Sequence, residues 1–119
     1  MTPLLSQEQF ETLLRPHRPS SDGFFAKYDA YVGIAFGADW CGPCRRLDKD
    51  KIVDLTPGVT WYYCDVDENN YTPGYCGVRS IPHFTLIKDG FFVDNKFPGA
   101  QNAEGVAEWV KSAFLTVKS

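Results

Sequence analysis

The feature that most constrains this chain is a pair of cysteines placed where a strand gives way to a helix. The run Tyr31–Ala38 (YVGIAFGA) is short and almost wholly apolar, which is typical of a strand buried on both faces. The segment Cys44–Leu55 is polar and then amphipathic, and it predicts a helix that ends before Thr56-Pro57-Gly58. The pentapeptide Trp40–Cys44 (WCGPC) therefore lies at a strand-to-helix junction.

This placement gives the two cysteines different chemistry. Cys41 falls at the start of the helix, where free backbone N–H groups favour an anion, so its thiolate should form readily. Cys44 lies on the same side of the first turn, within reach of one disulfide, and we expect it to be the more buried thiol with the higher pKa. Pro43 suits the first turn because its missing N–H removes no helical hydrogen bond. The pair predicts exchange in which Cys41 attacks a substrate disulfide and Cys44 resolves the mixed disulfide, with no bound cofactor.

A zinc site is the main alternative use of this cysteine pair. It would need two more ligands, and Cys64 and Cys76 form no second closely spaced pair, while His17 and His83 stand alone. We therefore expect no metal. A purely structural disulfide is also disfavoured, because a four-residue loop constrains the unfolded chain little.

The rest of the chain predicts one α/β domain, for which 119 residues are enough. Apolar patterning predicts a strand over Val59–Val66 and a hairpin of His83–Lys88 with Phe91–Phe97 around Asp89-Gly90. We expect helices at Ser6–Leu14 (with Ser6 and Gln9 as a capping box), Phe24–Ala30 and Asn102–Leu115, a loop at Arg15–Gly23, and a loop or short helix at Asp67–Gly77. The order of elements predicts a mixed sheet with helices on both faces.

Composition excludes several classes of function. The 12 basic and 15 acidic residues give a net charge of −3 with no basic stripe, so we expect no nucleic-acid partner. No apolar run approaches the roughly 20 residues of a membrane helix, so we expect no membrane partner. The segment Met1–Phe10 lacks the basic and apolar regions of a secretory signal, which favours the cytoplasm, although a processed secreted protein would look the same.

Taken together, these motifs resemble the thioredoxin family. The resemblance runs from about Leu4 to Leu115, and its anchors are WCGPC, the dipeptide Ile81-Pro82, the turn Asp89-Gly90, and Gly99 before the last helix. It implies a thioredoxin fold with a mixed sheet of four to five strands. It implies that Cys41 is the nucleophile, that Cys44 is the resolving thiol, and that Pro82 follows a cis peptide bond and faces the disulfide. The substrate-binding residues it implies are Trp40, Gly42, Pro43, Ile81, Pro82 and Gly99.

The resemblance also implies partners. It implies disulfide-containing substrate proteins, and a flavin-dependent thioredoxin reductase that supplies electrons from NADPH. The Gly-Pro pair between the cysteines resembles the reducing members of the family. Two alternatives remain open: an oxidase or isomerase of a secretory compartment, and a binding subunit that uses the fold without its thiols.

Several positions depart from the family pattern. Ala35 stands where many thioredoxins have a buried Asp, and Tyr63 where a Lys often accompanies it, which predicts that Cys44 resolves slowly. Asp39 is either a substitute proton acceptor or a solvated surface acid, and we favour the solvated acid. Lys49 replaces a proline that often kinks the active-site helix, so we expect a straighter helix. His83 follows Pro82 in place of Thr, and we favour a surface-facing histidine over a redox role.

The two remaining cysteines lie outside the redox motif. Cys64 lies in a predicted strand and is expected to be a small buried apolar residue. Cys76 falls in a predicted loop before Ile81-Pro82. Its role stays open between a regulatory thiol, a site of an intermolecular disulfide and an inert residue. A Cys64–Cys76 disulfide would depend on a distance that the sequence does not give.

Overall fold

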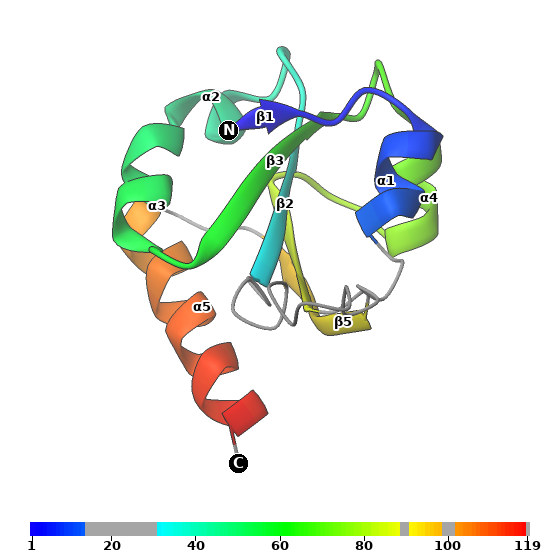
Figure 1. The fold of residues 1–119 in the computed structure, drawn as a ribbon. Helices are drawn as coiled ribbons and strands as arrows, with labels where there is room; N and C mark the ends of the chain where they lie inside the picture. The colour runs from blue at the N-terminus through cyan, green and yellow to red at the C-terminus, as the bar shows by residue number, and fades with distance from the viewer. Residues whose placement is uncertain (14–30, 89–90, 99–101, 119) are drawn as a thin grey trace.

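A computed structural model describes residues 1–13, 31–88, 91–98 and 102–118, and within them the chain forms one five-stranded mixed sheet (Figure 1). The strand order is β1-β3-β2-β4-β5. The strands are β1 (Thr2–Pro3), β2 (Tyr31–Gly37), β3 (Val59–Asp65), β4 (His83–Lys88) and β5 (Phe91–Pro98). β3 runs parallel to both β1 and β2, whereas β4 is antiparallel to β2 and β5. The predicted mixed sheet is confirmed, with five strands.

Helices cover both faces of this sheet, as expected. They are α1 (Gln7–Leu13), α2 (Gly42–Arg46), α3 (Lys49–Leu55), α4 (Tyr71–Cys76) and α5 (Ala103–Lys118). α3 and α5 lie on one side of the sheet, and α1 and α4 lie on the other (Figure 1). The predicted loop Arg15–Gly23, helix Phe24–Ala30 and turn Asp89-Gly90 lie outside the described residues.

The core under α3 and α5 is built around Trp61 on β3. Its ring lies flat against Gly33 of the neighbouring strand, where a Cβ would come within 2.5 Å of a ring carbon. The indole N–H of Trp61 donates to Thr56 Oγ1 at 2.8 Å, and the Thr56 hydroxyl donates to the Ile52 carbonyl at 2.6 Å. These bonds attach the end of α3 to the sheet while satisfying polar groups that are buried.

The opposite face of the sheet packs against α1 and α4. The residues buried between this face and the two helices are Leu4, Phe10, Ile34, Phe36, Cys64, Cys76 and Ile87. The predicted capping box begins α1, because the Gln9 N–H donates to Ser6 Oγ at 3.2 Å. The Gln9 side chain accepts in return from the Leu5 N–H at 2.7 Å, one residue earlier than the standard box.

The predicted straight helix from Cys44 to Leu55 is wrong. The chain forms two short helices, with Leu47 and Asp48 in extended conformation between them. The carboxylate of Asp48 accepts from the Lys51 N–H at 3.0 Å and so begins a new helix. Lys49 thus takes the first position of α3, where no intrahelical donor is required. The break arises from a capping side chain, and a proline is not needed to make it.

Candidate active site

A disulfide joins Cys41 and Cys44 immediately after the central strand β2. Their Cα atoms are 5.2 Å apart. Cys41 is the N-cap of α2, and its Sγ accepts from the Cys44 N–H at 3.2 Å, which places the sulfur where a thiolate would be stabilised. Cys41 is 5% exposed and Cys44 is 4% exposed. The two cysteines are therefore about equally buried, and the expected greater burial of Cys44 is not found.

The segment before β4 brings a second loop against this disulfide. The Ile81–Pro82 peptide bond is cis, as the family resemblance implied. The Ile81 carbonyl oxygen lies 3.8 Å from Cys41 Sγ, so it can accept a hydrogen bond from Cys41 once that residue is a thiol. The Ile81 side chain packs with Val66 against the buried group of Ala38, Cys41 and Cys44. An extended chain lying along this loop would pass directly over the reactive sulfur.

A groove of about 370 Å³ opens beside the disulfide. Its lining residues are Trp40, Val66, Pro73, Val78, Arg79, Ser80 and Ile81. Trp40 is 68% exposed, and its indole N–H donates to Asp67 Oδ2 at 2.8 Å. That bond orients a large apolar surface that would otherwise turn freely.

The sequence anticipated only part of this groove. Trp40 and Ile81 line it, while Gly42, Pro43 and Pro82 belong to the flanking segments and are not among its walls. Gly99 lies outside the described residues. The missed residues come from the end of β3, from α4, and from the run before Ile81. Val78, Arg79 and Ser80 directly precede the Ile-Pro dipeptide, which was the sequence signal for them, whereas Val66 and Pro73 carried no such signal.

Tyr63 lies behind the disulfide, on β3 beside Ala35 of β2. A Cβ built on Gly37 would lie 2.8 Å from the Tyr63 hydroxyl oxygen and 3.3 Å from Cys44 Cβ. The Tyr63 hydroxyl therefore borders the same small space as Cys44. Lys49 Nζ lies 3.8 Å from the centroid of the Tyr63 ring. Burial, and then the negative charges of Asp65 and Asp39, raise the pKa of Tyr63.

The other two cysteines are free and deeply buried. Cys64 is 0% exposed, as predicted, and Cys76 is 1% exposed. Burial raises the pKa of each thiol to about 12. Cys76 lies in the last position of α4, so the short helix is the correct one of the two structures expected for Asp67–Gly77, and the placement of Cys76 in a loop is wrong. An intermolecular disulfide at a thiol so enclosed would require the fold to open.

His83 is also buried, at 4% exposed, and its ring meets the Phe36 ring edge-on at 5.7 Å between centroids. The predicted surface-facing histidine is wrong. Alternation along β4 explains the position, because His83, Thr85 and Ile87 share the face that packs toward α1 and α4.

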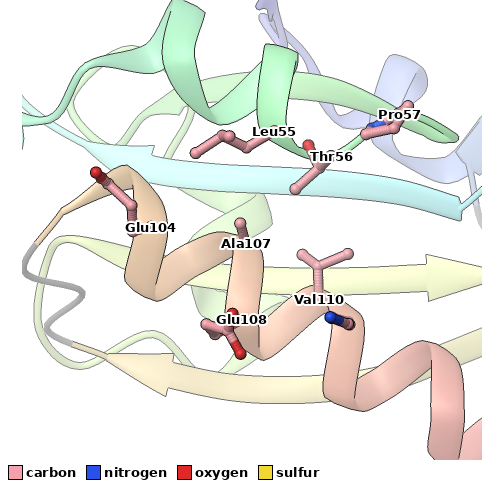
Figure 2. Close-up of a pocket in the computed structure, with 8 residues that line it drawn as sticks. Leu55, Thr56, Pro57, Glu104, Ala107, Glu108 and Val110 are labelled. Carbon is pink, nitrogen blue, oxygen red and sulfur yellow. The ribbon is translucent and has the colours of Figure 1, made fainter.

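The described residues offer few other sites. Among them, no three His, Cys, Asp or Glu side chains gather in a way that could hold a metal ion. No helix within them has both the length and the apolar character needed to cross a bilayer. Figure 2 shows a second hollow of about 370 Å³ between the end of α3 and α5, where Ala107 and Val110 point toward Thr56. Its described walls carry no thiol or imidazole and hence no redox group.

Comparison with known proteins agrees with this geometry. Residues 20–112 match the family model described as Thioredoxin. The chain is 38% identical over 88 residues to a thioredoxin of Rickettsia typhi, covering 71% of this chain and 83% of that protein. It is 36% identical over 90 residues to a thioredoxin of Rhodospirillum rubrum, covering 73% and 86%.

Solved structures show the same fold. The X-ray structure of Fasciola hepatica thioredoxin superposes with a TM-score of 0.74 at 26% identity, covering 95% of this chain and 99% of that one. Mitochondrial thioredoxin 3 of Saccharomyces cerevisiae, in its oxidised form, superposes with a TM-score of 0.72 at 27% identity, covering 94% of both chains.

Proposed function

This chain belongs to the thioredoxin family, and from that premise we propose that it reduces protein disulfides with Cys41 as the nucleophile and Cys44 as the resolving thiol. It is a thiol–disulfide oxidoreductase of thioredoxin type, and the Cys41–Cys44 disulfide is its redox group. The observation that carries the assignment of roles is the position of Cys41 Sγ. It accepts from a backbone N–H of α2 and faces the Ile81 carbonyl at the edge of an open groove.

The reaction follows from this arrangement. In the reduced protein, the Cys41 thiolate attacks one sulfur of a substrate disulfide, and the other substrate sulfur leaves as a thiolate that takes up a proton. Cys44 loses its proton and attacks Cys41 Sγ. The bond between Cys41 and the substrate breaks, and the second substrate thiolate leaves and is protonated. Two electrons have then passed to the substrate, and the protein holds the Cys41–Cys44 disulfide.

We assign substrate binding to the surface around this disulfide. Trp40 and Ile81 supply apolar area, and Gly42 and Pro43 lie in the redox turn itself. Backbone groups beside Pro82 would pair with an extended substrate segment, as in strand addition. Gly99 belongs to the proposed surface through the family resemblance.

Trapping of the mixed disulfide tests the two roles. Cys44→Ser should accumulate a stable disulfide between Cys41 and a model disulfide peptide, because the resolving thiol is absent. Cys41→Ser should accumulate none, since the sulfur that accepts from the α2 backbone N–H and faces the Ile81 carbonyl is then absent. Intact-mass measurement of both variants checks this. Equal adducts on both variants would reject the assignment.

The electron donor and the compartment complete the proposal. We assign re-reduction to a flavin-dependent thioredoxin reductase that uses NADPH, in the cytoplasm. Two free thiols kept in the core, at Cys64 and Cys76, are suited to a reducing compartment. NADPH oxidation by a purified bacterial thioredoxin reductase should depend on this protein. Dependence on glutathione reductase and glutathione alone would contradict the proposed donor.

A further inference from the structure

The resolving step requires Cys44 to become a thiolate, and none of the groove residues stabilises that thiolate. Cys44 is 4% exposed, and an anion in such a place is costly unless a hydrogen bond or a positive charge stabilises it. The Cys44 N–H already donates to Cys41 Sγ in the oxidised protein. The side of the disulfide that faces the sheet is where the structure offers a further group to stabilise the Cys44 thiolate.

Tyr63 lies there. Its hydroxyl oxygen and Cys44 Cβ both lie against Gly37, at 2.8 Å and 3.3 Å from the point where a Cβ would be. The missing side chain at Gly37 leaves this space open, and Tyr63 is the register partner of Ala35 on the neighbouring strand. A hydroxyl in this position can reach Cys44 Sγ directly or through one water molecule.

We propose that the Tyr63 hydroxyl donates a hydrogen bond to the Cys44 thiolate and thereby promotes the resolving step. The proposal rests on the roles given above to Cys41 and Cys44. Cys44 releases its proton to water. The thiolate, held by the phenol, attacks Cys41 Sγ and displaces the substrate thiolate, which is protonated in turn. The phenol keeps its own proton throughout, so Tyr63 is neither oxidised nor consumed.

The charges around Tyr63 act on this role in both directions. The groups that act on the phenol are Lys49 of α3, Asp39 after β2, Cys64 and Asp65 of β3, and Glu68 after β3. Burial and the acids raise the pKa of Tyr63, so the hydroxyl keeps its proton at neutral pH, as an ordinary tyrosine does, although a higher pKa makes it a weaker donor. The Lys49 ammonium, 3.8 Å from the ring centroid, opposes the effect of the acids by attracting electron density of the ring. Its positive charge also favours a nearby thiolate.

A single-turnover reaction separates the two chemical steps. The reduced protein, in excess, is mixed in a stopped-flow instrument with dithiobis-nitrobenzoate, which releases one coloured thiolate when Cys41 attacks and a second when Cys44 resolves. In Tyr63→Phe the ring and its Lys49 contact remain, and only the hydroxyl is lost. We expect the second phase to slow about tenfold, because a hydrogen bond to a charged group is lost. Its pH midpoint should rise by about one unit, and the first phase should not change.

Two further variants make the result decisive. Tyr62→Phe removes the hydroxyl of the adjacent tyrosine, whose side chain packs toward the opposite face, and both phases should match those of the parent protein. Lys49→Gln keeps Tyr63 and removes the cation, and the second phase should slow by roughly threefold. A second phase with unchanged rate and pH midpoint in Tyr63→Phe would overturn the proposal, as would equal slowing of both phases. Absence of the first phase in the parent protein would instead refute the proposed function.

Discussion

Replacing Gly33 with alanine should destabilise the fold by about 2 kcal/mol. The added methyl would lie 2.5, 2.6 and 2.9 Å from three atoms of the Trp61 ring, about 0.5 to 0.9 Å inside ordinary contact. The ring is 3% exposed, and its N–H is held by Thr56, so it cannot swing aside. Overpacking of this kind costs about 1–3 kcal/mol, and the lower entropy of the unfolded alanine chain returns only about 0.5 kcal/mol of that.

Urea and thermal unfolding followed by circular dichroism measure this effect. For a domain of this size, a loss of 2 kcal/mol should lower Tm by roughly 8 °C. Gly74→Ala is the matched control, because a Cβ at Gly74 meets nothing within 4 Å and the position is inside α4. It should raise stability by about 0.5 kcal/mol through the unfolded chain. Unfolding of Gly33→Ala at or above the midpoint of the parent protein would refute the packing described for Trp61.

Three further predictions concern the redox pair, the groove and the two buried thiols. Ala35→Asp would place a carboxylate beside Tyr63 and near Cys44, where it can accept the Cys44 proton. This variant should reduce insulin faster and should unfold at a lower urea concentration. An unchanged rate in the folded variant would contradict the idea that Cys44 lacks a proton acceptor. Asp67→Asn weakens the hydrogen bond that orients Trp40, and should raise KM for a protein disulfide about threefold. The rate of reaction with dithiobis-nitrobenzoate should not change. Equal effects on the protein disulfide and on dithiobis-nitrobenzoate would exclude a role of Trp40 in binding protein substrates at the groove. Because the pKa of Cys64 and of Cys76 is about 12 when folded, above the ordinary value of 9.0, stability is complete below pH 9 and should fall as pH rises toward 12. This fall should be smaller when both residues are alanine, and an equal fall would contradict the burial.

The elements that the sequence predicted well are those fixed by local patterning. The apolar run at β2, the aromatic and β-branched run at β3, and the two strands beside Asp89-Gly90 start at the predicted residues and end within one residue of the predicted bounds. The redox pair was equally predictable from the sequence, because a strand-to-helix junction constrains where two cysteines three residues apart can lie. The disulfide between Cys41 and Cys44 and the cis bond before Pro82 are both present.

What the sequence missed depends on contacts between distant segments. β1 has only two residues, Thr2 and Pro3, and it exists because it pairs with β3, so no local pattern marks it. The break between α2 and α3 depends on whether Asp48 caps a new helix or faces solvent within a longer one. Burial of Cys76 and His83 follows from the packing of α1 and α4 on the sheet, which neither residue's neighbours in sequence reveal.

The residues that line the groove were also hard to predict from local sequence. Val66, Pro73 and Val78 are ordinary apolar residues in sequence, and only the fold places them beside Trp40. The placement of Tyr63 at Cys44 is a further case, since it requires the register of β2 with β3 and the absence of a side chain at Gly37. The family resemblance marks Tyr63 as a departure, and the structure places its hydroxyl beside Cys44.

Reduction of insulin disulfides with dithiothreitol as the electron source tests the central claim most directly. The parent protein should accelerate precipitation of the insulin B chain, and Cys41→Ser, at equal concentration and with an unchanged circular dichroism spectrum, should lose that acceleration. Cys64→Ser is the matched control and should keep it, because that thiol is buried away from the groove. Acceleration that survives in Cys41→Ser, or its absence in the folded parent protein, would contradict the assignment of Cys41 as the nucleophile of a disulfide reductase.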